Sequence, residues 1–292
     1  MEFILTNGSA VGKATTRGGE LISFVKDSVE YVWYGIPEHW SGQAPCLFPV
    51  VCRAKDDKIT VDGKDYPMKK HGIARKIEYT PVEVTPNSVT LRFTDNEETL
   101  KSYPYKFILD ITHTVTDDGF VTEYKVTNTN DGDMTFCIGG HPGFNCPLRE
   151  GEKFEDYSII FDNAEGAVFK NCEEEGGYMD ASMPELDYVK NNEFKLFYDA
   201  FDLDAVVTDN LPVKKLKLVN RNTGHGIRFE FDSFDAIGFW TPIKMSSPFI
   251  CLEPWNGLPG DVAETSVLRD KKFAKTIGAG ESFTTSYKMT VI

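Results

Sequence analysis

The sequence predicts an all-β protein, an antiparallel β-sandwich or barrel with few short helices. Short runs of alternating apolar and polar residues dominate the chain, turn-forming residues separate them, and helical periodicity is scarce. Residues 107–115 alternate most clearly, and after an acidic turn at residues 117–119 the alternation resumes over residues 120–126. These two runs predict a hairpin.

The remaining elements follow from the same alternation. Two segments show helical spacing, residues 183–190 and 262–267, and each predicts one or two helical turns. The Gly-rich acidic segment 171–180 predicts a surface excursion, and since no linker or repeat is present, residues 1–292 are predicted to form one domain. Further strands are expected at residues 20–25, 30–34, 88–95, 158–161, 213–219, 226–231, 236–240, 249–252 and 282–292.

Composition narrows the class of function. With 41% hydrophobic and 26% charged residues among 292, the chain can bury a sizeable core. The net charge of −14 argues against nucleic acid or an anionic membrane as partner. No apolar run approaches the ~18 residues of a membrane span, and the N-terminus has no signal-peptide pattern, so a soluble, cytoplasmic protein is expected. The six cysteines show no spacing typical of a disulfide framework or zinc site.

A histidine stands at the end of an apolar run. Residues 134–138 read as a strand, Gly139 and Gly140 then remove side chains, and His141 follows at once. Imidazole is suited to proton transfer near neutral pH, so His141 is a candidate acid or base. The alternative is a structural histidine that bonds a buried carbonyl.

A second proton-transfer group leaves another apolar run. Glu253 follows residues 249–252 and precedes Pro254 and Trp255. Partial desolvation beside an indole raises a carboxyl pKa, which makes Glu253 a candidate base near neutral pH. The alternative is a glutamate paired with an arginine. Trp255 either stacks on the C–H face of a sugar or caps the core.

Two further segments offer ligand contacts. A turn at Gly72 is expected to aim His71 and Arg75 together, and the arginine fork suits sugar hydroxyls, carboxylate or phosphate. Asp204 stands at the mouth of an apolar strand, where it either binds ligand hydroxyls, orients a catalytic group or serves a turn. The neighbouring lysines are predicted to be solvated: Lys69, Lys70 and Lys76.

Other conspicuous residues are predicted to be structural. His113 lies on the apolar face of its strand, and Trp33 and Trp240 lie within strands, so all three are expected in the core. The chain has no His-x-His pair, dinucleotide fingerprint or P-loop. We therefore expect neither a metal nor a cofactor, and instead acid–base chemistry on a small polyhydroxylated ligand.

Taken together, these segments resemble a known family, the aldose 1-epimerase (galactose mutarotase-like) superfamily, and within it the LacX-like branch. The resemblance runs through most of the chain, in six motifs that follow one another in the expected order. These are Gly18-Gly19-Glu20-Leu21, residues 44–50, His71-Gly72-Ile73-Ala74-Arg75, residues 138–147, residues 201–205 and residues 248–257.

The resemblance implies a large twisted β-sandwich that interconverts the α and β anomers of a sugar. It further implies His141 as general acid and Glu253 as general base, with His71, Arg75 and Asp204 as ligand contacts. We hypothesise that ionised Glu253 takes the proton of the C1 hydroxyl while protonated His141 supplies a proton to the ring oxygen. The expected partner is a small sugar, bound by a monomer or a homodimer.

Departures from the galactose-specific branch leave the substrate open. The histidine motif reads Gly-Gly-His-Pro-Gly-Phe-Asn, where that branch has Asn and Tyr around its histidine, and Glu-Pro-Trp replaces Glu-Thr-Gln. Arg53 adds a second possible anion contact, so the sugar is either free or phosphorylated. A non-catalytic sugar-binding module, a glycoside hydrolase using Glu253 with Asp204, and a structural role remain as alternatives.

Overall fold

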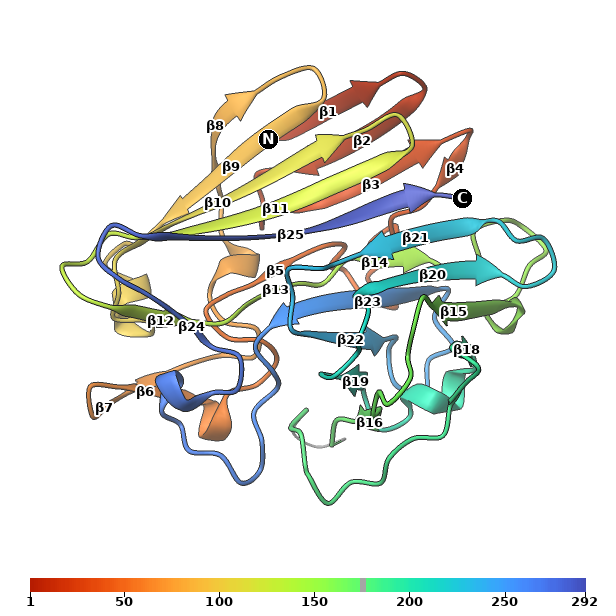
Figure 1. Ribbon diagram of the computed structural model, residues 1–292. Helices are drawn as coiled ribbons and strands as arrows, with labels where there is room; N and C mark the ends of the chain where they lie inside the picture. Colours follow the sequence, from red (N-terminus) through yellow and green to blue (C-terminus); the bar gives the residue numbers. More distant parts are fainter. Residues whose placement is uncertain (174–176) are drawn as a thin grey trace.

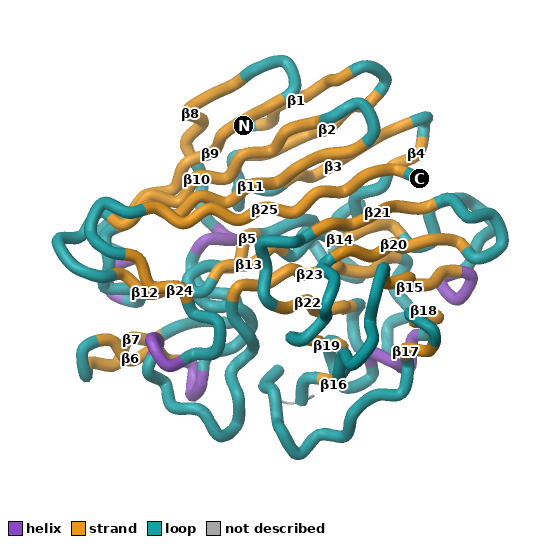
Figure 2. Tube along the Cα trace, viewed as in Figure 1, coloured by secondary structure: helices purple, strands orange, loops and turns teal. Residues whose placement is uncertain are grey.

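The computed structural model describes residues 1–173 and 177–292, and its largest element is a ten-stranded antiparallel sheet (Figures 1 and 2). Its strand order is β17-β18-β15-β20-β21-β25-β11-β10-β9-β8. In chain order the strands are β8 (Thr80–Val84), β9 (Ser88–Thr94), β10 (Phe107–Val115), β11 (Gly119–Asn128), β15 (Tyr157–Phe161), β17 (Val189–Lys190), β18 (Glu193–Lys195), β20 (Lys215–Asn220), β21 (Gly226–Glu230) and β25 (Ser282–Val291).

A seven-stranded and a four-stranded sheet face the ten-stranded one, and two separate two-stranded pairs complete the described strands. The seven-stranded sheet contains β5 (Cys46–Leu47), β13 (Ile138–Gly140), β14 (Gly143–Asn145), β16 (Lys170–Asn171), β19 (Val206–Thr208), β22 (Ala236–Trp240) and β23 (Phe249–Asn256). The four-stranded sheet contains β1 (Glu2–Asn7), β2 (Ala10–Thr15), β3 (Leu21–Lys26) and β4 (Val29–Glu30). The pairs are β6 (Lys58–Val61) with β7 (Lys64–Pro67) and β12 (Met134–Phe136) with β24 (Lys275–Ile277).

The predicted all-β sandwich is confirmed, and so is its clearest hairpin. Strands β10 and β11 pair from Phe107 with Asn128 to Val115 with Phe120, and burial alternates strictly along β10. His113 is buried as predicted. Its ring nitrogens lie 3.0 Å from Thr122 Oγ1 and 2.9 Å from the Gly19 carbonyl oxygen, which accounts for a polar group on this apolar face.

In the part of the chain that the structure describes, helical structure is restricted to short 3₁₀ segments, and the two predicted helices were wrong. Residues 183–190 form an irregular segment that ends in β17, and residues 262–267 form turns and a bridge. Leu186 and Val262 donate their amides to distant carbonyls, of Phe169 and Met179, so long-range pairing replaces local helix bonds. Within the described ranges the 3₁₀ segments are Lys55–Asp57, Ala74–Lys76, Thr99–Lys101, Phe154–Asp156, Tyr198–Phe201 and Leu268–Asp270.

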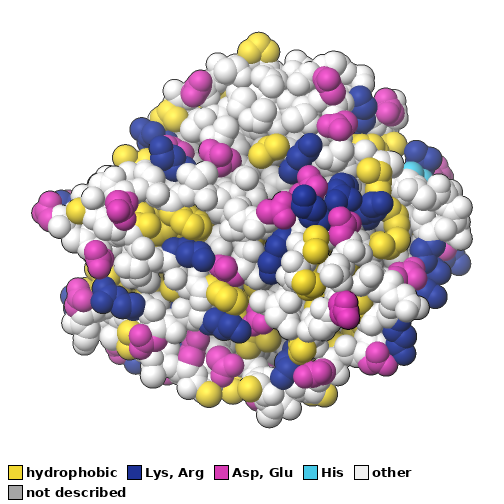
Figure 3. Space-filling model, in the orientation of Figure 1, with side chains coloured by type: hydrophobic (Ala, Val, Ile, Leu, Met, Phe, Trp, Pro, Cys, Tyr) yellow, Lys and Arg dark blue, Asp and Glu magenta, His cyan; other side chains and the backbone are white. Residues whose placement is uncertain are grey.

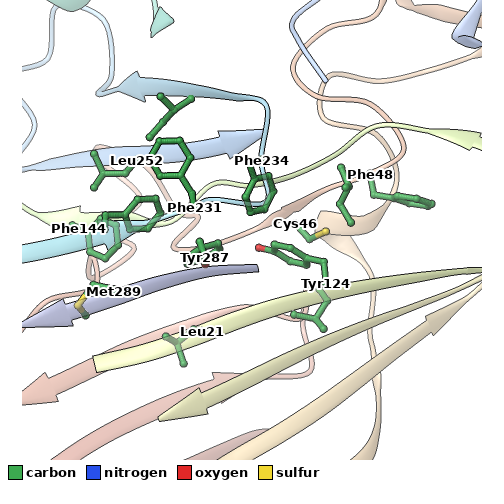
Figure 4. Close-up of a cluster of buried hydrophobic side chains, with 14 of the residues drawn as sticks. Leu21, Cys46, Phe48, Tyr124, Phe144, Phe231, Phe234, Leu252, Tyr287 and Met289 are labelled. Carbon is green, nitrogen blue, oxygen red and sulfur yellow. The ribbon is translucent and has the colours of Figure 1, made fainter. Parts of the chain in front are cut away.

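The core lies between the ten-stranded sheet and the two sheets that face it. Figure 4 shows Tyr124 of β11 pointing toward Cys46 of β5, with Tyr287 of β25 nearby and Phe144 of β14 at the other end of the cluster, near Met289. These side chains are at most 1% exposed, and such burial is the main source of stability in a fold of this kind. The seven-stranded sheet thus rests on the core with one face, from which Ile250 and Leu252 of β23 project, and its other face carries the candidate site.

Hydrophobic side chains are scattered over the face of the molecule seen in Figure 3. Acidic and basic side chains intermix over the face seen in Figure 3. Over residues 1–173 and 177–292 we find no helix long and apolar enough to cross a membrane. The predicted excursion 171–180 begins at the edge strand β16, and its residues 174–176 lie outside the described residues.

Candidate active site

His141 and Glu253 are placed by the pairing of three strands. His141 lies in the gap between β13 and β14, and both of these strands pair with β23. The register is the same on either side of the gap, with Gly139 opposite Trp255 and Gly143 opposite Cys251. His141 therefore falls directly opposite Glu253. Residues opposite each other in an antiparallel pair project to the same face, so the sheet itself brings the two side chains together.

The two glycines before His141 are required by packing. A Cβ on Gly139 would lie 2.6 Å from Trp255 Cδ1, and one on Gly140 would lie 2.8 Å from Tyr287 Cε1. The bulky groups that approach this backbone are thus aromatic side chains of the protein. The sequence pattern correctly indicated a close approach at these glycines.

The histidine and the glutamate are in contact and buried. Nε2 of His141 lies 3.2 Å from Oε2 of Glu253, and the two residues are 6% and 2% exposed. Burial lowers the pKa of His141 to about 3, and nearby Lys70 and Arg75 act in the same direction. Burial raises the pKa of Glu253 well above its usual value; Asp204 adds to this effect and Lys70 opposes it.

Because the shifts are opposite, the pair holds one proton between the lowered pKa of His141 and the raised pKa of Glu253. A neutral imidazole beside a protonated carboxyl and an imidazolium beside a carboxylate differ only in which residue holds that proton. Among the described residues Oε2 of Glu253 has no hydrogen-bond partner, so it is free to meet a ligand. The pair is electrically neutral in both forms. A buried site therefore tolerates it far better than a single unpaired charge.

His71 enters the site as a neutral hydrogen-bond donor. Its Nδ1 accepts a hydrogen bond from the Cys52 amide at 3.2 Å, which places the ring proton on Nε2. Burial lowers the pKa of His71 well below its usual value, with His141 and Arg75 acting in the same direction. The left-handed backbone at His71 (φ 65°) and Gly72 (φ 77°) makes this placement possible.

The opposite side of the cavity carries an ion pair. Lys70 Nζ lies 3.7 Å from Oδ2 of Asp204, which is 8% exposed and adopts a left-handed backbone (φ 115°). Lys70 was predicted only to be solvated, but it also lines the cavity. Arg75 lines the same cavity, and burial lowers its pKa. A ligand here meets donors from Lys70 and Arg75 and an acceptor from Asp204.

The site is a cavity of about 200 Å³ that adjoins a groove of about 770 Å³. The groove shares Lys70, Asp204 and Trp240 with the cavity. The cavity is lined by Trp40, Cys52, Lys70, His71, Arg75, His141, Cys172, Asp204, Ala205, Trp240 and Glu253. Five of the predicted site residues thus meet in one place: His71, Arg75, His141, Asp204 and Glu253.

The structure places the other two predicted site residues outside the cavity. Trp255 is fully buried and packs against Gly139 and Gly238, so it belongs to the core and offers a sugar no exposed face. Arg53 lines the outer groove, where its guanidinium binds both carboxylate oxygens of Asp57 at 2.6 Å. This pairing uses two of the five N–H donors of Arg53, on the side of the guanidinium that faces Asp57.

Two tryptophans were missed as site residues. Trp240, predicted to be core, lines the cavity, and its ring centroid lies 5.5 Å from that of His141. Trp40 stacks on His141 at 4.9 Å with an interplanar angle of 29°. The position of Trp240 at the end of its strand was the available signal. Trp40 lies in a loop without periodicity, so no local pattern could identify it.

Three buried groups could meet a metal ion, but their chemistry disfavours one. Ligand atoms of His141, Cys251 and Glu253 lie within 4.8 Å of one another. Burial raises the pKa of the Cys251 thiol well above its usual value, so the thiol stays protonated. Because thiolate is the form that binds metals, the set fits acid–base work better than metal binding.

Comparison with known proteins identifies the family. Residues 1–269 match the family model described as aldose 1-epimerase, and the chain therefore belongs to that family. Protein LacX, chromosomal, of Lactococcus lactis subsp. lactis is 37% identical over 301 aligned positions that cover all of both chains. This relative agrees with the LacX-like branch suggested by the motifs.

Solved structures agree with the fold. A galactose mutarotase-like protein from Lactobacillus casei superposes with a TM-score of 0.93 at 28% identity, with full coverage of both chains. A galactose mutarotase related enzyme from Lactobacillus acidophilus gives a TM-score of 0.91 at 26% identity, covering all of this chain and 97% of the other. The galactose mutarotase-like sandwich is therefore the fold of this chain.

Proposed function

We propose that this protein is an aldose 1-epimerase that interconverts the α and β anomers of a hexose by acid–base ring opening. The observation that carries the proposal is the buried contact of 3.2 Å between His141 and Glu253 at the wall of a cavity of about 200 Å³. A proton donor and a proton acceptor held side by side are what this reaction requires.

The reaction needs two simultaneous proton transfers. The C1 hydroxyl loses its proton, its electron pair forms the carbonyl, the bond from C1 to the ring oxygen breaks, and that oxygen gains a proton. Rotation about the C1–C2 bond then presents the other carbonyl face, and the same steps in reverse close the ring. No atom enters or leaves, so the enzyme ends with the same single proton on its pair.

His141 and Glu253 divide these roles. In the proposed step the pair reacts in its imidazolium–carboxylate form: Glu253 accepts the C1 proton while His141 protonates the ring oxygen. Each correctly placed group typically contributes about 10²–10⁴-fold. The low pKa of His141 makes its imidazolium a strong acid, and the high pKa of Glu253 makes its carboxylate a strong base.

The surrounding groups suit a polyhydroxylated ring. The His71 Nε2–H and Arg75 donate hydrogen bonds, Asp204 accepts them, and Trp240 offers an apolar wall against C–H groups. The adjoining groove lets a substituent on the sugar extend outward. The proposal therefore covers free hexoses and hexose phosphates, and the assay must compare them.

The decisive experiment is the rate of anomer equilibration, followed by polarimetry or NMR. Galactose, glucose and glucose 6-phosphate are compared with the wild type and with His141→Asn and Glu253→Gln. We expect acceleration by the wild type and its loss in both variants, with sugar binding retained. Wild-type turnover by Glu253→Gln with normal binding would refute the assigned roles. Binding by the wild type without acceleration would instead identify a sugar-binding protein.

A further inference from the structure

A loop with no assigned role covers the catalytic histidine. We call residues 36–45 the Trp40 loop. The indole of Trp40 stacks on His141 at 4.9 Å and on Phe249 at 5.7 Å, and meets Trp240 edge-on at 5.6 Å. It lines the catalytic cavity on one side and a second cavity of about 830 Å³ on the other. Trp40 is therefore the wall between the two spaces.

Side-chain to backbone hydrogen bonds hold this loop in place. Oε2 of Glu20 accepts the amides of Gln43 at 2.9 Å and Ala44 at 2.8 Å. Gln43 Nε2 donates to the carbonyls of Ile22 and Trp33, both at 2.6 Å. Trp33 Nε1 donates to the carbonyl of Trp40 at 2.8 Å. The loop has no regular secondary structure of its own, so these bonds fix its path.

Glu20 is an unusual residue for a merely structural task. Burial raises its pKa, while its two backbone bonds and the nearby Arg17 and Arg75 act in the opposite direction. Burying a carboxylate is costly, and here hydrogen bonds and cations offset that cost. The space beside Glu20 requires a glycine at position 18, because a Cβ there would lie 2.9 Å from Oε1 of Glu20.

We infer that Glu20 is a positioning residue, which holds Trp40 against His141 through the amides of Gln43 and Ala44. The kinetic part of this inference rests on the proposed function, whereas the structural part does not. With Trp40 in place His141 is 6% exposed, so water is kept from the proton-transfer pair. Release of the loop would hydrate His141, and it would remove one apolar wall of the cavity.

Two substitutions at Glu20 separate hydrogen bonding from charge. Both backbone bonds end on the same oxygen, so the amide oxygen of Glu20→Gln can accept both, whereas Glu20→Ala accepts neither. Losing two charge-assisted bonds is expected to lower kcat/KM roughly tenfold to a hundredfold in Glu20→Ala. Glu20→Gln is expected to retain most of the wild-type value.

A spectroscopic readout tests the position of Trp40 directly. The chain has four tryptophans, so labelling with 5-fluorotryptophan gives four ¹⁹F resonances, and Trp40→Phe assigns the one of interest. In Glu20→Ala we expect this resonance to move toward its solvent-exposed position while that of Trp255 stays. Glu20→Gln should keep the wild-type spectrum. An unchanged Trp40 resonance in folded Glu20→Ala overturns the inference.

A second variant moves Trp40 without touching Glu20. A Cβ on Gly42 would lie 2.5 Å from Trp40 Cζ2, so Gly42→Ala displaces the indole while the anchor is intact. Gly42→Ala should reproduce the resonance shift and the loss of kcat/KM. If Glu20→Ala does not fold, this variant still tests whether displacing Trp40 lowers kcat/KM. A displaced resonance with unchanged kcat/KM would refute the role of Trp40. If the wild type lacks mutarotase activity, the proposed function fails, and the NMR result still decides whether Glu20 holds the loop.

Discussion

Nε2 of His141 lies 3.2 Å from Oε2 of Glu253, and the two residues occupy opposite positions of paired antiparallel strands. The contact is therefore built into the sheet and needs no ligand to form. Groups carried on a rigid scaffold hold their geometry better than groups on loops. One shared proton between such groups has consequences for pH dependence.

Above about pH 5, the pH profile of kcat/KM should contain one descending limb and no acid limb. The pair gains a second proton only near the lowered pKa of His141, about 3, and loses its one proton as pH rises through the raised pKa of Glu253. Activity should thus be constant from about pH 5 upward and fall only as pH rises through the raised pKa of Glu253. Anomerisation rates across pH, corrected for the buffer-catalysed reaction, test this. An acid limb near 6.5 would show that His141 titrates as an ordinary histidine.

Two neighbouring substitutions should move the alkaline limb in opposite directions. Besides burial, the largest influence on the pKa of Glu253 is Asp204, which raises it, while Lys70 lowers it. Asp204→Asn should therefore shift the limb to lower pH, and Lys70→Met should shift it to higher pH. Both variants weaken sugar contacts, so the readout is the midpoint of the limb, not the size of the rate. Shifts in the same direction would contradict the electrostatic account.

Packing around Trp255 should make Gly238 intolerant of a methyl group. A Cβ there would lie 2.3 Å from Trp255 Cη2, and the indole is fully buried. Gly238→Ala should lower the free energy of unfolding by about 1–3 kcal/mol, the usual cost of overpacking a core. The matched control is Gly132→Ala, where a Cβ meets nothing within 4 Å and the cost should be below about 0.5 kcal/mol. Equal unfolding midpoints in urea would exclude tight packing.

The stability of the fold should fall in mild acid. Burial lowers the pKa of His113 to about 4, from an ordinary value of 6.5, because the folded state holds the ring neutral. Its contribution is complete above about pH 6.5 and is lost as pH falls toward about 4, up to about 3 kcal/mol in all. His71 and His141 act in the same direction.

His113→Gln isolates this contribution. The variant should lose stability at pH 7 yet show a smaller decline between pH 7 and pH 5 than the wild type. Urea unfolding at the two pH values measures both. An unchanged decline would place the acid sensitivity elsewhere.

Local sequence patterns were enough to predict the sheet-rich architecture and five of the residues in the cavity. Alternation over residues 107–115 depends on which side chains face the core, and that information is local. The glycines and prolines around His141 and the apolar run before Glu253 likewise indicate where β13 ends and where β23 runs. These signals do not require knowing which strands pair. Local patterns were enough for these features because each depends on near neighbours in the chain.

The set of groups that share the cavity wall depends on long-range contacts and could not be predicted from local patterns. Trp255 was expected there but lies in the core, while Trp40 and Lys70 arrive from loops whose positions depend on distant partners. The helices expected at residues 183–190 and 262–267 were replaced by backbone bonds to remote carbonyls. Strand register and loop anchoring are set by contacts between residues far apart in sequence. Periodicity within one segment does not indicate which distant residues make those contacts.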